Sequence, residues 1–488
     1  MKKKRIYFSW LVLIWGLIFS VLSQPVKAAS VDHSLEKVQK RGKLIVGTSP
    51  DYPPYEFLVN QNGKEKVVGL DIDISRKIAH DLGVKLEIKK MDFDSILVGI
   101  ETGKIDMGIS ALSPTTKRKE SVDFSQTYYK SGQYLIINKN DKNIYRDKDS
   151  FQGKTLGAQN GSIQSELLKK QMPKSSGRYL TKVSDLILAL KSHKVEGVVA
   201  ESAVAIAYVK NDPSLAYING NFNLGSDQLG SAIAFAKNSP SLVQAVNKSL
   251  TTIKNKHLVS QYLADAGKYM QTTKSNHTML HYWRYFANGV GYTLLISAVS
   301  AVFGIILGLV FAIMRLSRNR IFHDLAVAYI EFVRGSPLMV QVMFVYFGLG
   351  MIVNLPALLS GIIAVSLNSA AYVAEIIRGG INSIPQGQTE AARSLGLSER
   401  QTLQSVILPQ ALKNIWPALG NEFISLIKES SIVSIIGVTD LIYQLRTVQA
   451  ATYKGVAPIL VAMVLYFVMT FGLSRILGYF EKRMKHDN

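Results

Sequence analysis

The 488-residue sequence contains no cysteine, and only 19% of its residues are charged. The absence of cysteine excludes disulfides, thiol catalysis and cysteine-ligated metal sites. It also excludes the lipid-modified cysteine that tethers many proteins to a cell surface. Any tether must therefore be built from the chain in another way.

Acidic residues are also few, with 35 Asp and Glu against 56 Lys and Arg, which gives a formal net charge of +21. An excess of this size can mark a nucleic-acid-binding protein, but no basic–aromatic stripe or DNA-reading helix pair accompanies it. Positive loops beside a membrane explain the excess more simply. We therefore expect membrane lipid among the partners and no nucleic acid.

Phosphate-binding loops are missing as well. Gly153-Lys154-Thr155 lacks the upstream glycine that a Walker loop requires, and no nucleotide fingerprint follows a predicted strand. We therefore expect that the chain is not an enzyme, hydrolyses no ATP, and binds no cofactor or metal of its own.

The apolar residues, 48% of the total, are concentrated after residue 286, and the length favours two or three separate units. At the start, residues 1–29 combine a basic run, an apolar stretch over 6–22 and small residues around Lys27, which predicts a signal peptide. The alternative is an uncleaved anchor helix, since the stretch approaches the roughly 20 residues that span a bilayer. In both cases the chain from Ala29 onward starts outside the cell.

Residues 30–268 alternate short β-branched strands, such as 43–47, with amphipathic helices, such as 71–80. This alternation predicts an α/β domain with mostly parallel sheets. Ligands of such sheets collect at the carboxyl ends of the strands, in loops such as 48–55. Residues 269–286 then follow as a short polar linker.

Residues 287–488 contain apolar segments of the length that crosses a hydrocarbon core of about 30 Å. The five predicted spans are Val290–Met314, Leu325–Ile352, Ala357–Ile377, Ile415–Ile436 and Ala457–Ile476. An odd number of spans places the C-terminus in the cytoplasm, and the Lys and Arg residues after the first, third and fifth spans agree with this topology. Glu331 and Arg334 interrupt the second span; we expect them at the cytoplasmic interface, the alternative being a cavity or partner at membrane depth.

A family resemblance in the α/β domain is carried by residues 106–125, by Gly69-Leu70-Asp71 and by Asp92-Phe93-Asp94. These motifs resemble the polar-amino-acid family of periplasmic-type solute-binding proteins, over residues 40–270. The resemblance implies a two-lobed α/β periplasmic-binding-protein fold of type II, whose lobes close on an amino acid. Two crossing strands would join the lobes, near 132–137 and 229–235.

A free amino acid presents a carboxylate and an ammonium on one carbon, so a selective pocket needs a planar bidentate donor and an acidic acceptor. The resemblance implies that Arg118 binds the carboxylate, with Ser113 and Ser110 as hydroxyl partners. It implies that Glu201 binds the ammonium. Most relatives have aspartate at this position, so the carboxylate of Glu201 lies one methylene further out.

The resemblance also implies that Tyr52 and Phe93 sandwich the carbon chain of the ligand; the alternative is that both are core aromatics. Gln159 and Ser162 match a loop of the second lobe that hydrogen-bonds the ligand on closure. Ser49 replaces an aspartate that several relatives direct at a basic or amide side chain. We therefore favour glutamine or another neutral polar amino acid, and leave arginine and histidine open.

In the membrane region, residues 331–341 resemble a signature of the amino-acid permease subunits of ABC importers. The strongest motif there consists of Glu390-Ala391-Ala392, Gly396 and Val406-Ile407-Leu408-Pro409. It resembles the cytoplasmic loop by which importer permeases dock on their ATPase, with Val406 where isoleucine is commoner. We expect a short helix that ends at Gly396 in a left-handed turn.

Polar residues in the fourth predicted span have two interpretations. They either line the translocation path or form interhelical hydrogen bonds that hold the bundle together. These residues are Asn421, Glu422, Lys428 and Ser431.

Together these features predict an amino-acid-binding domain fused to an all-α, five-span ABC importer permease in the cell membrane. By resemblance it works as a homodimer with two ABC ATPase subunits, which hydrolyse the ATP. Two other classes share the binding fold, namely a soluble dehydratase of aromatic amino-acid synthesis and the glutamate-receptor channels. The intact pair of Arg118 and Glu201 and the docking loop oppose the first, and spans that follow the binding domain rather than interrupt it oppose the second.

Overall fold

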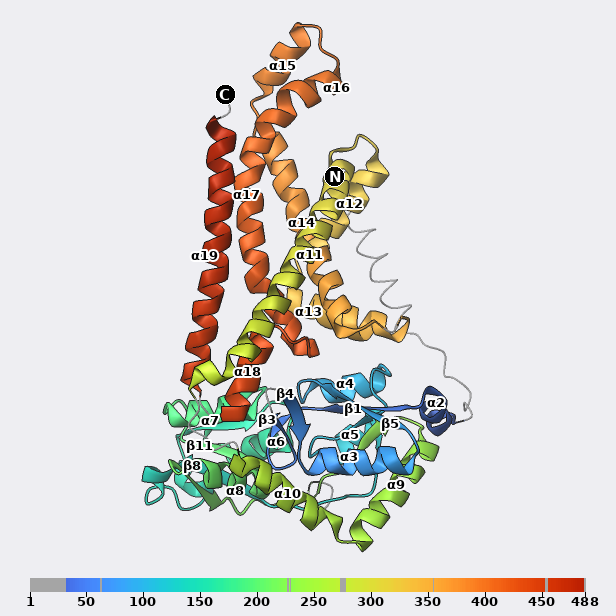
Figure 1. The fold of residues 1–488 in the computed structure, drawn as a ribbon, viewed down its shortest axis with the longest axis vertical. Helices are drawn as coiled ribbons and strands as arrows, with labels where there is room; N and C mark the ends of the chain where they lie inside the picture. The colour runs from blue at the N-terminus through green and yellow to red at the C-terminus, as the bar shows by residue number, and fades with distance from the viewer. Residues whose placement is uncertain are drawn as a thin grey trace.

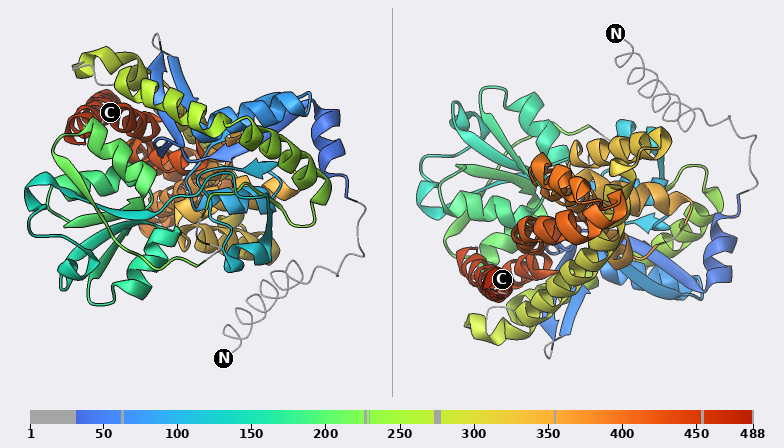
Figure 2. Two further views of the ribbon diagram at one scale, coloured as in Figure 1. Left: turned by 90° about the horizontal axis from the view of Figure 1, so that it is seen from below. Right: turned by 90° about the horizontal axis from the view of Figure 1, so that it is seen from above.

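The structure is a computed structural model, and it describes residues 32–61, 64–225, 228, 230–272, 278–353, 355–452 and 455–486. The predicted signal peptide, residues 1–29, lies outside these residues. A body of strands and helices lies at one end, and a bundle of long helices rises from it (Figure 1). Viewed along the bundle, the two halves of the α/β body lie side by side (Figure 2).

The first lobe is built on a five-stranded sheet with the order β5-β1-β6-β13-β7. Its strands are β1 (Lys43–Thr48), β5 (Lys85–Lys90), β6 (Met107–Gly108), β7 (Val122–Phe124) and β13 (Ala234–Ala236). A small sheet contains β2 (Asp51–Tyr52), β3 (Glu56–Gln61) and β4 (Lys64–Val68). The helices are α2 (Ser34–Arg41), α3 (Leu70–Asp81), α4 (Ser95–Glu101), α5 (Thr116–Ser121), α9 (Pro240–Asn255) and α10 (Leu258–Thr272). Strand β1 is buried on both faces, as expected for a strand between layers of helices.

The second lobe has the sheet order β10-β9-β11-β8-β12. Its strands are β8 (Gln133–Asn138), β9 (Thr155–Gln159), β10 (Ser176–Leu180), β11 (Gly197–Glu201) and β12 (Leu215–Asn219), and its helices are α6 (Ile163–Gln171), α7 (Val183–Lys191) and α8 (Ser202–Asn211). The prediction of mostly parallel sheets is only half correct. In each five-stranded sheet two pairings are parallel and two are antiparallel. The antiparallel pairings arise because β8 and β13 each enter their sheet from the other lobe.

Two segments connect the lobes, one from β7 to β8 and one from β12 back to β13. They pair with each other at Tyr129 and Ser231. The first crossing therefore lies a few residues before the predicted 132–137, most of which belongs to β8. A double connection of this kind permits hinge closure of two rigid lobes.

The membrane region consists of helices that run mainly along one direction (Figure 1). They are α11 (Trp283–Leu316), α12 (Arg320–Arg334), α13 (Leu338–Met343), α14 (Ala357–Asn382), α15 (Gln386–Ser394), α16 (Glu399–Thr402), α17 (Leu408–Glu429), α18 (Leu441–Thr452) and α19 (Val456–His486). By length and hydropathy, α11, α14 and α19 can each cross a membrane. Helix α12 and the helical stretch that follows it can together form a fourth span.

The second predicted span, Leu325–Ile352, is not one straight helix. Helix α12 and the stretch Leu338–Met351 meet at an angle of 105°. The break falls at Gly335, Ser336 and Pro337, and Pro337 caps the start of the second piece. Proline has no N–H for the preceding helical turn, so it ends α12 and redirects the chain.

The fourth predicted span, Ile415–Ile436, falls on α17 but does not match its limits. Helix α17 ends at Glu429, and residues 430–436 form a 3-10 helix. Within the described residues, α17 is not among the helices that length and hydropathy identify as spans. Polar residues such as Asn421, Glu422 and Lys428 lower its mean hydropathy.

The predicted linker, residues 269–286, is helical at both ends. Helix α10 continues to Thr272, and a 3-10 turn over Met279–Tyr282 leads directly into α11. Residues 273–277 lie outside the described part of the chain.

Helices α11 and α14 pack closely through small residues. A Cβ added to Gly304 would lie 2.9 Å from Ser369 Oγ, and one added to Gly308 would lie 2.6 Å from Val373 Cγ1. Small residues let helix backbones approach closely inside a membrane, where apolar side chains gain little by leaving lipid.

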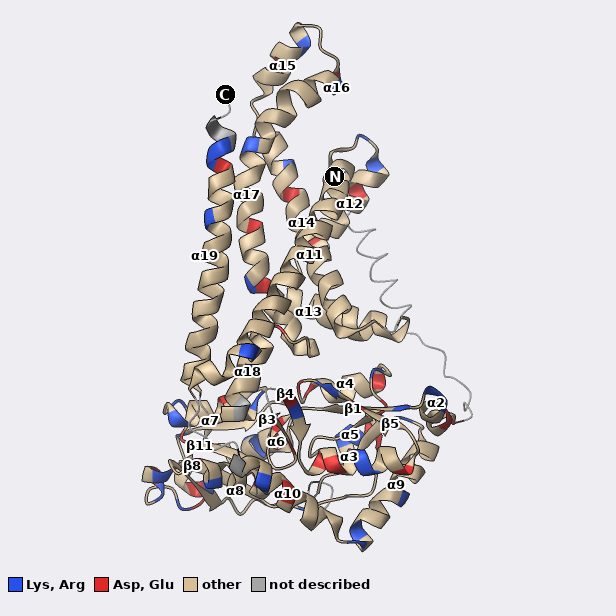
Figure 3. Cartoon of the chain, viewed as in Figure 1, with Lys and Arg blue, Asp and Glu red and all other residues tan. Residues whose placement is uncertain are grey.

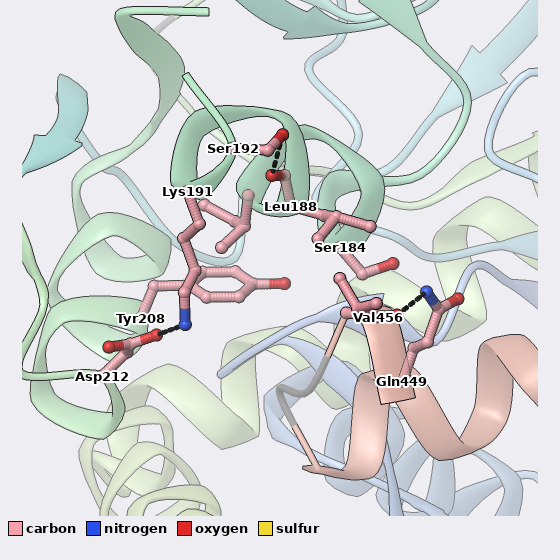
Figure 4. A pocket seen from close by; sticks show the side chains of 10 residues that line it. Ser184, Leu188, Lys191, Ser192, Tyr208, Asp212, Gln449 and Val456 are labelled. Atoms are coloured by element: carbon pink, nitrogen blue, oxygen red, sulfur yellow. Dashed lines mark hydrogen bonds and ion pairs between the residues drawn. The ribbon is translucent and has the colours of Figure 1, made fainter. Parts of the chain in front are cut away.

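The α/β body contacts the helices through α18 and neighbouring loops. Lys104 Nζ donates to the Leu355 carbonyl at 3.2 Å, and Arg446 Nη1 on α18 lies 4.0 Å from Asp92 Oδ1. A hollow remains between α7 and α8 of the second lobe on one side and Gln449 and Val456 on the other (Figure 4). Both lobes therefore face the same end of the helical bundle.

Candidate functional site

One cavity between the lobes brings together seven of the eight residues that sequence analysis placed in the ligand site. The space between its walls, open solvent included, is about 240 Å³. Its lining is Tyr52, Phe93, Ser110, Ala111, Ser113 and Arg118 from the first lobe and Gln159, Ile163, Gln164 and Glu201 from the second. Most of these residues end a strand or follow one, so the cavity lies at the carboxyl edges of both sheets.

Arg118 lies on α5, whose N-terminus is capped by the side chain of Thr115. Its Nη1 donates to the Ser113 carbonyl at 2.9 Å, and its Nη2 donates to the Gly161 carbonyl of the second lobe at 3.0 Å. The guanidinium lies 5.5 Å from the centre of the Phe93 ring, within cation–π range. Burial lowers the pKa of Arg118 to about 10, so the group stays charged at neutral pH.

Glu201 ends β11 on the opposite side of the cavity and is 4% exposed. Tyr55 donates its hydroxyl to Glu201 Oε2 at 2.5 Å, and the Glu201 N–H donates to the Tyr52 hydroxyl at 3.3 Å. Burial raises the pKa of Glu201 to about 7, although the bond from Tyr55 acts in the other direction. A cation placed beside this group would favour its carboxylate form.

Two buried carboxylates behind the first-lobe loops were not singled out as site residues from the sequence. Ser110 donates to Glu56 Oε1 at 2.5 Å, and the Ala111 N–H donates to Asp71 Oδ2 at 2.9 Å. Burial raises the pKa of Asp71 to about 6. Their contacts fix the loop that carries Ser110 and Ser113. The Gly69-Leu70-Asp71 motif contained a signal for Asp71, whereas Glu56 follows the segment Tyr52-Pro53-Pro54-Tyr55, which gives none.

Ser162 is the one predicted ligand residue that does not line the cavity. Its Oγ accepts from the Ser165 N–H at 3.3 Å, as the N-cap of α6, and donates to the Gln159 carbonyl at 2.7 Å. Gln159 lines the cavity, and its Nε2 donates to the Thr181 carbonyl at 3.1 Å. In this arrangement Ser162 shapes the loop rather than facing the ligand space.

A buried lysine that sequence analysis missed crosses between the lobes. Lys182 Nζ, from the second lobe, lies 2.9 Å from Asp92 Oδ1 and 3.2 Å from Ser49 Oγ, both in the first lobe. It is also 3.9 Å from Asp51 Oδ1. A single lysine before an apolar helix is usually solvated, so the sequence contained no signal for this cluster.

The predicted docking loop forms two short helices at the end of the bundle far from the α/β body (Figure 1). Glu390 and Ala391 on α15 are exposed, whereas Ala392 is buried against the rest of the loop. Gly396 has φ of +86°, which confirms the left-handed turn expected after the first helix. Glu390 thus lies on an exposed face of α15.

Glu422 and Asn421, the proposed path residues on α17, face different surroundings. Glu422 Oε1 accepts from Ser369 Oγ of α14 at 3.2 Å, whereas Asn421 is exposed. Nearer the docking loop, Arg315 and Arg334 lie 3.0 and 3.5 Å from the carboxylate of Glu375. Interhelical bonding therefore accounts for Glu422 in this chain, and it does not account for Asn421.

Arg118 and Glu201 line a cavity between two hinged lobes, and these lobes are joined to membrane helices that carry an exposed loop of two short helices. This combination defines a solute-binding protein fused to an importer permease. Residues 44–265 match bacterial extracellular solute-binding proteins, family 3, and residues 304–486 match the binding-protein-dependent transport system inner membrane component.

Individual proteins match each half. The arginine transport system permease protein ArtQ of Bacillus subtilis (strain 168) is 41% identical over 206 residues, which cover 42% of this chain and 94% of ArtQ. A putative glutamine transport system permease protein GlnP of Rickettsia conorii is 38% identical over 202 residues, which cover 41% of this chain and 93% of GlnP. An amino acid ABC transporter substrate-binding protein from Streptococcus pneumoniae, whose crystal structure contains bound L-arginine, is 35% identical in sequence. Its structure matches with a TM-score of 0.47, and the match covers 48% of this chain and 98% of that protein.

The chain belongs to the amino-acid ABC importers, as a family 3 solute-binding domain fused to a permease domain. It is a multi-pass membrane protein that functions in amino-acid import.

Proposed function

We propose that this chain captures a polar amino acid, with glutamine favoured, between its two lobes outside the cell and passes it through its own permease helices. The observation that supports this most directly is the single cavity shared by Arg118 and Glu201. Arg118 offers a fork of donors for a carboxylate, and Glu201 offers an acceptor for an ammonium, which are the two groups common to free amino acids. Basic amino acids remain the alternative ligand class.

The energy for transport comes from a separate ABC ATPase subunit that docks on α15. Glu390 on the exposed face of α15 supports this contact, together with the rigid turn at Gly396. The chain itself supplies neither ATP hydrolysis nor a cofactor. A permease homodimer with two ATPase subunits is the working unit, and the exposed apolar faces of α11 and α19 are available for the second copy and for lipid.

The binding domain lies outside the cell and the C-terminus lies in the cytoplasm. Lys and Arg residues gather at the ends of the helices away from the α/β body (Figure 3). Short loops rich in Lys and Arg face the cytoplasm in most membrane proteins. Residues 1–29 act as the export signal that this topology requires.

Reconstitution tests this function. The full chain is combined with its ATPase in proteoliposomes, and uptake of labelled amino acids is measured with ATP inside or outside. We expect uptake of a neutral polar amino acid that requires ATP on the side of the docking loop, and ATP hydrolysis that rises with that ligand. Absence of any amino-acid-stimulated hydrolysis or uptake would refute the proposal.

A further inference from the structure

A lysine of the first lobe is buried against the permease helices. Lys104 lies in the turn between α4 and β6, and only 2% of the residue is exposed. The turn is held in place, because the Lys104 N–H donates to the Gly99 carbonyl at 2.9 Å and Lys89 Nζ donates to the Lys104 carbonyl at 2.9 Å. Lysine is almost never fully buried unless its charge has partners. The partners of Lys104 are therefore informative.

Three permease residues surround the end of this side chain, and we call Tyr346, Gly350 and Leu355 the socket. Lys104 Nζ donates to the Leu355 carbonyl at 3.2 Å and lies 4.8 Å from the centre of the Tyr346 ring, within cation–π range. Gly350 leaves room for the stem of the lysine, because a Cβ added to Gly350 would lie 2.1 Å from Lys104 Cε. A larger side chain at position 350 and a seated lysine thus exclude each other.

The socket lies on the irregular stretch that follows the 105° bend after α12. Beyond α13 the chain forms a π-helix over Phe344–Gly348 and a 3-10 turn over Leu349–Met351. Changes of helical type within one stretch often mark a functional hinge. Tyr346 belongs to the π-helix and Gly350 to the 3-10 turn, so Lys104 contacts the permease where the helical geometry changes.

The socket is also continuous with the core of the permease. Tyr346 is buried in one hydrophobic cluster with Val365 of α14 and Leu426 of α17. Helix α14 leads into the predicted docking loop, and α17 leads out of it. Because a packed interior has few voids, a displacement of Tyr346 requires an adjustment of both helices.

A second contact of the first lobe has the same form. Lys90 Nζ lies 5.0 Å from the centre of the Tyr443 ring on α18. The Lys90 carbonyl faces Gly437, where an added Cβ would lie 2.4 Å from the carbonyl oxygen. Two lysines of one lobe thus rest on two tyrosines of the permease, each beside a glycine that permits close approach. The first lobe is therefore seated on the permease at two defined points.

We propose that Lys104 and the socket are the contact through which the binding domain acts on the permease, so that stimulation of the ATPase by ligand requires Lys104 in the socket. This inference rests on the proposed function, and it assigns residues to the step between capture and ATP hydrolysis. Lys104 is not among the residues that line the cavity of Arg118 and Glu201. Its loss should therefore leave capture unchanged.

The test combines the full chain with its ATPase in lipid nanodiscs, with glutamine and arginine as probes in parallel. In Lys104→Ala the stimulation of ATP hydrolysis by the bound amino acid should fall by about fivefold or more, which is the lower range for coupling between two sites. The Kd from calorimetry should stay within about twofold of wild type, as expected for distant sites. The matched control is Lys248→Ala, an exposed lysine on α9 of the same lobe, which should keep full stimulation.

Gly350→Leu tests the same contact from the permease side. The added side chain meets the flexible end of Lys104 rather than backbone, so it should expel the lysine and leave the helices folded. Because both changes empty one socket, the double variant Lys104→Ala/Gly350→Leu should lose no more stimulation than the worse single variant, whereas independent defects would multiply.

Full stimulation in a folded Lys104→Ala variant would overturn the proposal, and this measurement does not depend on whether Gly350→Leu folds. Multiplied losses in the double variant would overturn it as well, as would a Kd that rises in step with the loss of stimulation. These outcomes leave amino-acid import intact. Absence of amino-acid-stimulated hydrolysis in the wild-type complex would instead refute the proposed function.

Discussion

Replacing Arg118 by alanine should remove most amino-acid binding and leave both lobes folded. The guanidinium bonds the Ser113 carbonyl in its own lobe and the Gly161 carbonyl in the other, and it is the donor proposed for the ligand carboxylate. Loss of one partner of a buried, hydrogen-bonded charge pair costs about 2–5 kcal/mol. At about 1.4 kcal/mol for each tenfold change, Kd should rise roughly 30-fold to several thousand-fold.

The assay is isothermal titration calorimetry of glutamine against the full chain in nanodiscs, with thermal unfolding to verify folding. Lys117→Ala is the matched control, because Lys117 is an exposed cation directly beside Arg118. Its Kd should stay within about twofold of wild type, as expected for a surface charge. Undiminished affinity in Arg118→Ala, or an equal loss in Lys117→Ala, would refute the assignment of the carboxylate site to Arg118.

Four further predictions follow from the geometry. Below its raised pKa of about 7, Glu201 is protonated and offers no charge to the ammonium of a ligand. The Kd for ligand should therefore rise by up to about tenfold for each pH unit below 7 and level off above pH 7, and this dependence should disappear in Glu201→Gln. A flat wild-type profile between pH 5 and 8 would contradict the role of Glu201. Glu390→Arg should abolish ligand-stimulated ATP hydrolysis without changing the Kd for ligand, and normal uptake would remove the docking role. Gly396→Val should destabilise the docking turn by about 1–2 kcal/mol, because its φ of +86° is unfavourable for a branched residue, and should lower uptake while binding stays normal. Arg446→Glu should weaken stimulation of the ATPase by ligand several-fold, whereas Lys248→Glu on α9 should not; equal stimulation in both would show that the contact of Arg446 with Asp92 has no role in coupling.

Several of the predicted site residues that line the cavity share one property, namely a position at or just after the end of a strand that the sequence pattern indicates clearly. Ser110, Gln159 and Glu201 end or follow buried apolar strands, and the sheet order then brings them to one cavity without further information. Gly396 was predictable for a related reason, since a glycine after a short helix commonly adopts the left-handed conformation.

The features that the sequence does not reveal depend on contacts between distant segments. Lys182 is buried because Asp51 and Asp92 approach it from the other lobe. The residues next to Lys182 in the sequence do not predict these contacts. Hydropathy along the sequence indicates the length and composition of an apolar segment but not the direction of its helices, so it did not predict the 105° bend after α12. The limits of α17 were misplaced for the same reason, because an apolar run continues beyond the residue at which the helix ends.

The fusion of the two domains creates a problem that the interface geometry addresses. A binding domain held by a short connection is always at high effective concentration near its permease, whether or not it carries ligand. Discrimination between loaded and empty domains must therefore come from the contact surface. At Asp92 three bodies meet, because the first lobe supplies the carboxylate, Lys182 of the second lobe pairs with it, and Arg446 of the permease approaches it. Separation of the lobes would withdraw Lys182 and leave this network incomplete, so the permease faces a surface that exists in full only when the lobes are together.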